Sequence, residues 1–183
     1  VADIAIDSCR IAVASLNKQL LDKRTFEVNV DLGPISVAEK ISTNFEELMS
    51  ELDISLDRAL AISVGIPGPV DSHRGIIVRP PLLPGWDGFE ACKFMSERFN
   101  CDAIVDNDVN LKALGEARAL GVDSLPLLMI NVDIGVGGGF VSESGLLLHG
   151  ADGAAGDIGH VRVYEDSDLL CACGSRGCSA QEN

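Results

Sequence analysis

The sequence lacks a long hydrophobic run and is poor in basic and aromatic residues. Its 183 residues include 14 Lys and Arg against 28 Asp and Glu, which gives a formal net charge of −14 at pH 7. Binding to nucleic-acid phosphates requires clustered Lys and Arg, so this composition argues against DNA or RNA binding by the segment itself. No apolar stretch reaches the roughly 18 residues that a membrane span needs. We therefore expect no membrane partner.

The N-terminus also lacks a basic leader and opens directly on alternating, strand-like residues. We therefore expect a cytoplasmic protein, in which the six cysteines stay reduced or bind metal instead of forming three disulfides. Cys9, Cys92 and Cys101 stand singly among apolar residues, which is typical of buried free thiols.

The first two thirds of the chain alternate between helix and strand patterns. Residues 1–28 predict a strand, a turn at Asp7–Arg10 and a second strand. Apolar residues at helical spacing predict a helix over 36–52 that begins with a capping box from Ser36 to Glu39. The remaining segments of this part predict two strands, within 59–68 and at 102–105, and two helices, around 89–99 and at 109–120.

The pattern restarts after Gly121, with an apolar strand, a glycine-rich turn and a return strand. Nine of the 19 glycines fall between Gly135 and Gly159, which indicates a region built on tight turns. We therefore expect an α/β protein of two lobes, with a first lobe over 1–121 and the start of a second lobe over 122–183.

One histidine and three cysteines near the end of the sequence have the spacing of a metal site. Zinc prefers thiolate and imidazole ligands in a tetrahedron, and four protein ligands leave no position for a reactive water. His160, Cys171, Cys173 and Cys178 supply such a set, with Gly174 and Gly177 allowing the chain to turn around the ion. We predict structural Zn²⁺; the alternative is a group of unliganded or oxidised thiols.

Several motifs together resemble the ROK family, whose name joins repressors, open reading frames and kinases. The most specific are GADGAAGDIGHVRV over 150–163 and CACGSRGC over 171–178. Four further stretches continue the resemblance in the family's order: VGIPGPVDSHRG (64–75), PPLLPGW (80–86), VDNDVNLKALGEA (105–117) and IGVGGGFV (134–141).

The resemblance implies an actin-like ATPase, ribonuclease H-like α/β fold with a ligand cleft between two lobes. It implies cytoplasmic bacterial proteins that are either sugar kinases or sugar-responsive transcription factors. Family members continue well past the last cysteine, so we expect the second lobe to be truncated. In the regulators a winged helix-turn-helix precedes the first strand, so DNA would be bound only through a head that this segment does not contain.

The resemblance also assigns a sugar pocket to Asn107, Asp108, Asp157 and His160. In the kinases the aspartate at position 108 is the general base for the attacking sugar hydroxyl. Asn107 and Asp108 also stand at the start of a predicted helix, where they would cap it. Both roles remain open.

The sequence departs from the kinases at both phosphate-binding turns. The first, between the first two strands, reads IAIDSCRI and contains no glycine, while Asp7 adds a repelling charge. The second keeps its glycines but begins with Asp133 and Ile134 in place of small and hydroxyl-bearing residues, so the pattern favours a structural hairpin over a nucleotide-binding turn. ATP and Mg²⁺ binding is therefore not expected.

The predicted pocket has changed as well. Leu82 replaces an asparagine that contacts the sugar in the family, Asp157 replaces a glutamate, and Ala180 replaces another glutamate. The leading hypothesis is therefore a non-catalytic region of a ROK-type regulator, like the xylose and N-acetylglucosamine repressors, that binds a sugar or sugar-phosphate effector and forms a homodimer or tetramer. The alternatives are an ATP-dependent sugar kinase with Asp108 as base, and a zinc-stabilised module without a ligand.

Overall fold

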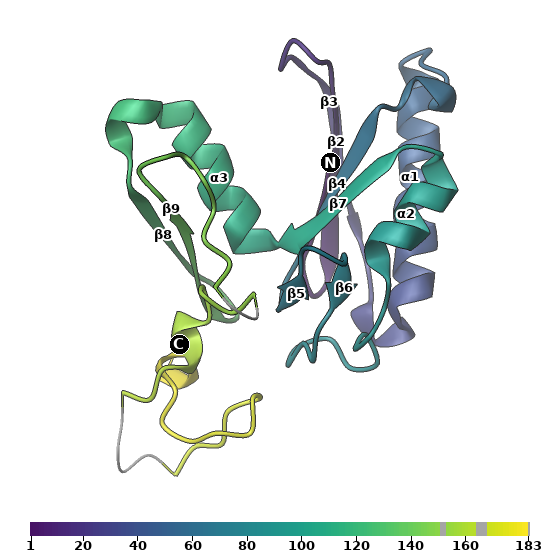
Figure 1. Cartoon of the computed structure of the whole chain (residues 1–183). Helices are drawn as coiled ribbons and strands as arrows, with labels where there is room; N and C mark the ends of the chain where they lie inside the picture. The colour runs from purple at the N-terminus through teal and green to yellow at the C-terminus, as the bar shows by residue number, and fades with distance from the viewer. Residues whose placement is uncertain (151–152, 164–167, 183) are drawn as a thin grey trace. The chain divides into compact units, whose positions relative to one another are not determined.

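The structure is a computed structural model that describes residues 1–150, 153–163 and 168–182 (Figure 1). The chain divides into two compact units, Val1–Asp108 and Val109–Asn183. This division falls after the first residue of helix α3 (Asp108–Leu120), whereas the sequence pattern predicts a lobe boundary after the helix. The extent of the functional lobes remains a prediction.

A five-stranded mixed sheet forms the centre of the first unit. Its strands lie in the order β3 (Leu20–Glu27), β2 (Ser8–Ala14), β1 (Ala2–Ile4), β4 (Ala61–Ile66) and β7 (Asp102–Asn107). β1, β4 and β7 are parallel to one another, and β2 and β3 join them as an antiparallel hairpin. The carboxyl ends of three parallel strands therefore meet at one edge of the sheet, where α/β proteins commonly bind ligands.

Helices α1 (Pro34–Glu51) and α2 (Ala91–Phe99) lie along the sheet in Figure 1. The rings of Phe45 and Phe99 join the two helices edge to face, with centroids 5.8 Å apart. The inward residues of the strands alternate, as in β4, where Ile62, Val64 and Ile66 are buried together in the core. Burial of this apolar face holds the helices on the sheet.

Two local predictions for this unit were wrong. Residues 1–28 form three strands, and Ser8, Cys9 and Arg10 belong to β2 instead of a turn. The connection is Ala5–Asp7, closed by a bond from the Ala5 N–H to the Ser8 carbonyl of 2.8 Å. β2 pairs with β1 on one side and β3 on the other, and this double pairing extends it into the predicted turn.

The predicted capping box does not form either. α1 begins two residues earlier than expected, with Gly33 as N-cap at φ 87° and Pro34 in the first turn, and no side chain caps it. Proline fits this position because it has no N–H to leave unpaired. Ser36 therefore lies inside the first turn of the helix.

The segment between β4 and α2 carries two short strands and a buried tryptophan. β5 (Val70–Asp71) and β6 (Ile76–Ile77) form a small antiparallel ladder. Trp86 is 1% exposed, and its Nε1–H donates to the Val30 carbonyl at 2.9 Å. Val30 lies in η1 (Val30–Leu32), and a further 3-10 turn, η2 (Leu56–Arg58), precedes β4.

In the second unit, α3 packs on a two-stranded hairpin. β8 (Leu127–Val132) and β9 (Val136–Val141) form the expected antiparallel pair, and Val141 packs with Ala113 and Ala117 of α3 in a small core. Three short 3-10 helices complete the described part of this unit: η3 (Val122–Ser124), η4 (Ile158–His160) and η5 (Ser179–Glu182). In the part of the chain that the structure describes, no helix is both long and apolar enough to cross a bilayer.

Candidate metal centre and ligand site

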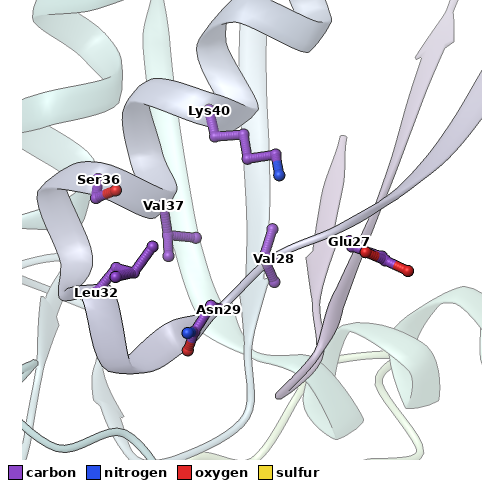
Figure 2. A pocket seen from close by; sticks show the side chains of 7 residues that line it. All are labelled: Glu27, Val28, Asn29, Leu32, Ser36, Val37 and Lys40. Carbon is purple, nitrogen blue, oxygen red and sulfur yellow. The ribbon is translucent and has the colours of Figure 1, made fainter.

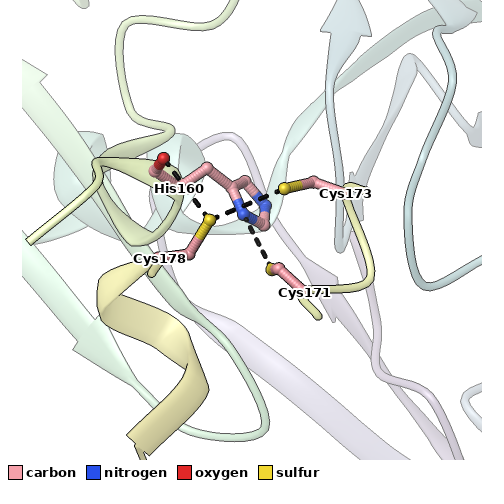
Figure 3. A group of neighbouring side chains, drawn as sticks. All are labelled: His160, Cys171, Cys173 and Cys178. Atoms are coloured by element: carbon pink, nitrogen blue, oxygen red, sulfur yellow. Dashed lines mark hydrogen bonds between the residues drawn. The ribbon is translucent and has the colours of Figure 1, made fainter. Parts of the chain in front are cut away.

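The four predicted zinc ligands come together in the second unit. The nitrogen and sulfur atoms that His160, Cys171, Cys173 and Cys178 offer all lie within 4.8 Å of one another (Figure 3). His160 is the last residue of η4, and the cysteines come from the loop that follows and from the residue before η5. The structure thus brings together residues that are up to 18 positions apart.

The distances within this cluster fit a four-coordinate zinc ion. His160 Nδ1 lies 3.5 Å from Cys171 Sγ, and Cys173 Sγ lies 3.7 Å from Cys178 Sγ. A tetrahedron with Zn–S of about 2.3 Å and Zn–N of about 2.0–2.1 Å has S–S edges of about 3.8 Å and N–S edges of about 3.6 Å. Both separations agree with these edges, so the residues present suit zinc without an open position.

Backbone hydrogen bonds hold the cysteine loop in this arrangement. The Cys171 N–H donates to the Ser175 carbonyl and the Gly174 N–H to the Cys171 carbonyl, each at 2.8 Å. The Val163 N–H donates to the Gly177 carbonyl, also at 2.8 Å, which joins the loop to the segment after η4. Gly174 and Gly177 have φ of +87° and +73°, the left-handed region that a side chain would strain. The predicted role of these glycines agrees with this geometry.

The geometry distinguishes the two ring nitrogens of His160. Nδ1 faces the Cys171 sulfur, and the Cys178 thiol approaches the His160 carbonyl at 3.6 Å (Figure 3). Nε2 is then the nitrogen left for a second partner, as is usual for metal-bound histidines.

The thiols have different proton affinities. Burial, together with the neighbouring thiols Cys173 and Cys171, raises the pKa of Cys178 to about 11. Burial acts to raise the pKa of Cys173 as well, but hydrogen bonds with Ser175, Cys171 and Cys178 together outweigh it and lower the pKa of that thiol. A metal ion must therefore displace a firmly held proton from Cys178, which makes loading dependent on pH.

Asn107 and Asp108 lie where β7 ends and α3 begins. The Asn107 side-chain amide donates to the Gly68 carbonyl at 3.1 Å, and its backbone N–H donates to Asp106 Oδ1 at 2.7 Å. Asn107 is thus positioned from two sides at the carboxyl edge of the parallel strands. Sequence reasoning missed Gly68 and the buried Asp106; the only signals were the glycine in IPG and the aspartate directly before Asn107.

Asp157 and Ala180 lie beside the metal cluster. Asp157 occupies the N-cap position of η4, and partial burial raises its pKa, an effect that the charge of His160 offsets in part. Ala180 belongs to η5, which is fixed to η4 by the Ser179 hydroxyl donating to the Ile158 carbonyl at 3.0 Å. Asn107 and Asp108 belong to the other unit, and a common pocket for both pairs remains a prediction.

The glycine run of β9 serves close packing within the second unit. A Cβ on Gly139 would lie 2.6 Å from Ala113 Cβ and 2.7 Å from the Val109 carbonyl of α3. Before η4, the backbone of Gly156 lies directly against the carbonyl of Gly138, so a Cβ on Gly156 would collide with that carbonyl. The Gly138 N–H in turn donates to the Gly156 carbonyl at 2.7 Å.

A separate pocket of about 190 Å³ lies in the first unit, between the end of β3 and the start of α1 (Figure 2). Its lining residues are Glu27, Val28, Asn29, Leu32, Ser36, Val37 and Lys40. None of the predicted site residues lines it. The charged groups at its rim are exposed, so the pocket is an open hollow and not an enclosed binding site.

Comparison with known proteins identifies relatives of both functional classes. The model of the ROK family matches residues 2–181. A glucokinase from Halalkalibacterium halodurans is 30% identical over 177 residues, covering 96% of this chain and 53% of the relative. A putative xylose repressor from a Caldicellulosiruptor species is 27% identical over 177 residues, covering 96% of this chain and 44% of the relative.

Solved structures agree with this fold. The crystal structure of a ROK family transcriptional regulator, a homologue of the E. coli MLC protein, superposes with a TM-score of 0.81 at 22% identity, covering 97% of this chain and 44% of that one. The expected actin-like α/β architecture is therefore confirmed. The chain spans about half the length of the relatives that it matches.

Proposed function

The chain belongs to the ROK family, and we propose that it is the sugar-effector-sensing and oligomerisation region of a ROK-type transcriptional regulator, without catalytic activity. The relatives include kinases as well as repressors, so the family alone does not decide between them. The observation that carries the proposal is the chemistry of the two turns that would have to hold the phosphates of ATP.

The first turn, Ala5–Asp7, offers little to a phosphate. It contains no glycine, and the Ala5 N–H is already bonded to the Ser8 carbonyl. The Asp7 side chain is exposed and accepts a hydrogen bond from the Ser8 hydroxyl at 3.0 Å. Phosphate cradles use unpaired backbone N–H groups and avoid carboxylates, so this turn favours a protein that does not bind ATP.

The second turn also supports a protein that does not bind ATP. Gly137, Gly138 and Gly139 are paired with β8 as part of an antiparallel ladder, and close packing accounts for their lack of side chains. The connection between the two strands begins with Asp133, which is exposed and whose charge repels a polyphosphate. The glycine run therefore has a structural explanation that needs no nucleotide.

The proposed effector is a sugar or sugar phosphate. Asn107, held by Gly68, and Asp108 would accept or donate hydrogen bonds to its hydroxyls, together with Asp157 and Nε2 of His160. Leu82 and Ala180 remove polar partners that the family provides, and each unmet buried group costs about 1–3 kcal/mol. We therefore expect a ligand with fewer hydroxyls to satisfy than an ordinary hexose has.

We propose that Zn²⁺ is structural, held by His160, Cys171, Cys173 and Cys178. The ion would link the cysteine loop to η4. It would take no part in a reaction, because the protein supplies all four ligands and leaves no coordination position for water or substrate. This fixes His160 at the proposed ligand pocket.

The assembly would be a homodimer or tetramer in the cytoplasm. A net charge of −14 disfavours direct DNA contact by this segment, so operator binding would require a separate basic head. No membrane association is proposed.

Calorimetric titration and a coupled ADP assay test this function. The zinc-loaded chain is titrated with glucose, xylose, N-acetylmannosamine and their phosphates, and separately with Mg-ATP. We expect heat of binding from one of the sugars, none from Mg-ATP, and no ADP release. Asp108→Asn should weaken sugar binding by about tenfold, the loss of one good polar contact, whereas Asp123→Asn, on η3, should not change it. ADP release that depends on Asp108 would instead establish a kinase.

The sugar kinase is the second candidate, because Asp108 stands directly after Asn107 at the carboxyl end of β7, as the kinase mechanism requires. In that case Asp108 would take the proton from the sugar hydroxyl. Mg-ATP would then bind in the calorimetric experiment.

A further inference from the structure

The three thiols of the metal cluster differ in their access to solvent. Cys171 and Cys178 are buried, whereas Cys173 is exposed. An oxidant in solution therefore meets the Cys173 sulfur first. The three thiols of the cluster thus differ in how easily a dissolved reagent reaches them, although the four ligand atoms are close to one another.

The Cys178 thiol lies close to this exposed sulfur, with 3.7 Å between the two Sγ atoms (Figure 3). A disulfide has an S–S length of about 2.05 Å, so its formation requires an approach of less than about 2 Å. Gly174 and Gly177 lie between the two cysteines, and a Cβ on Gly174 would meet nothing within 4 Å. The turn that carries Cys173 is therefore open on this side, and the approach would come from the exposed Cys173 side chain, because backbone hydrogen bonds hold the turn itself.

Cys178, in contrast, is held in place. It forms a β-bridge with Arg162, and the Ser179 N–H donates to the Val161 carbonyl at 3.1 Å. One sulfur is therefore fixed by backbone pairing, while its partner lies on an exposed turn. This pairing of a reachable thiol with a fixed, buried one is the arrangement of an attacking and a resolving cysteine.

We propose that Cys173 is an oxidation site at which a hydroperoxide closes a Cys173–Cys178 disulfide and expels the zinc ion. The inference rests on the zinc site proposed above. The Cys173 sulfur attacks the O–O bond and becomes a sulfenic acid, while the second peroxide oxygen leaves as water or an alcohol after protonation. The Cys178 sulfur then forms the S–S bond, and the sulfenic oxygen leaves as water. The two sulfurs lose two electrons, which reduce the peroxide.

Loss of two ligands releases the metal and affects the proposed sugar site. Only His160 and Cys171 remain after oxidation, too few for a closed zinc site. His160 then loses the metal that would fix its ring, and it belongs to the short helix η4, whose N-cap position is occupied by Asp157. The proposed consequence is a regulator whose effector affinity falls under peroxide stress.

The experiment treats the zinc-loaded chain with hydrogen peroxide and follows zinc release with a chromophoric chelator. Metal content is measured first, and non-reducing peptide mapping identifies the disulfide. We expect one zinc released for each Cys173–Cys178 disulfide, and reloading after reduction by dithiothreitol. Absence of zinc at the start would contradict the proposed metal site. Retention of zinc, or release with a different cysteine pair or none, would contradict the oxidation site alone.

Two matched variants sharpen the test. Cys173→His and Cys171→His both keep four ligands of the Cys2His2 type, but only the second retains the Cys173–Cys178 pair. We expect peroxide-driven release to slow at least tenfold in Cys173→His and to continue in Cys171→His. Equal release from both would overturn the proposal, and the wild-type mapping decides the question even if one variant does not load zinc.

Discussion

At the scale of single residues, Cys178 should be the most sensitive of the proposed metal ligands. Its side chain is fully buried, so replacement by serine leaves a buried hydroxyl and three ligands. We expect Cys178→Ser to hold less than about half an equivalent of zinc and to lose about 2 kcal/mol or more of unfolding free energy. Elemental analysis and urea titration measure these changes. Cys101→Ser, outside the cluster, should keep both values; zinc retained in Cys178→Ser would exclude this residue as a ligand.

Cys9 should make the stability of the first unit depend on alkaline pH. Burial and the nearby charge of Asp3 raise its pKa from 9.0 to about 12. The unfolded chain ionises this thiol above pH 9 while the folded chain keeps it protonated, so its stabilising contribution falls by up to about 1.4 kcal/mol per pH unit above pH 9.

Urea titrations of wild type and Cys9→Ala at pH 8, 9 and 10 test this dependence. The stability difference between the two proteins should shrink as the pH rises, because only the wild type carries the thiol. A difference that stays constant across this range would show that Cys9 is not buried as described.

The cluster of one histidine and three cysteines could be predicted from the sequence, whereas its environment could not. His160 and the three cysteines are chemically distinctive and close in sequence, so spacing alone indicates their shared role. Gly68 supports Asn107 through a backbone carbonyl, and any residue would provide the same atom. Contacts of this kind depend on how loops fold back, and the backbone carbonyl that makes them is common to all residue types.

At the scale of elements, the close contact between α3 and β9 should be intolerant of added volume. We expect Gly139→Ala to lower the unfolding free energy by about 1–3 kcal/mol, because its methyl group would collide with Ala113 and the Val109 carbonyl. Gly115→Ala is the matched control within α3, where a methyl group meets nothing within 4 Å. It should stabilise the helix by about 0.5–1 kcal/mol. Thermal and urea unfolding measure both, and equal effects would contradict the packing.

Element prediction succeeded where periodicity was strong and failed at the ends of elements. The helix 36–52 and the hairpin β8–β9 have long regular patterns, and both are present. The turn predicted at Asp7–Arg10 was misplaced. Cys9 and Arg10 pair with β1 on one side and β3 on the other, so they belong to the strand. The alternation of apolar and polar residues predicts which face of the sheet a side chain lies on, but the length of a strand depends on the strands that pair with it.

At the scale of the whole molecule, the two units have separate sources of stability. The first has a large apolar core around Trp86, the only tryptophan, while the second combines a small core with the metal cluster. We expect a chelator to unfold the second unit first, because a domain with little apolar core depends on its metal.

Tryptophan fluorescence and amide hydrogen exchange follow this behaviour during EDTA treatment of the zinc-loaded chain. Trp86 emission should keep its folded wavelength while exchange accelerates in α3 and the β8–β9 hairpin. Addition of excess zinc is the control and should restore protection. A simultaneous shift of Trp86 emission would mean that the two units unfold as one.

The direct backbone contact between Gly138 and Gly156 restricts how this protein can be engineered. Most attempts to retune a ligand site replace the side chains that surround it, but no side chain exists at this contact, and a Cβ added at Gly156 would collide with the Gly138 carbonyl oxygen. If the proposed sugar site is correct, changes in specificity would come from positions such as Leu82 and Ala180. The β8–β9 hairpin does not tolerate added side chains at these glycines, so a directed-evolution library should leave them unvaried.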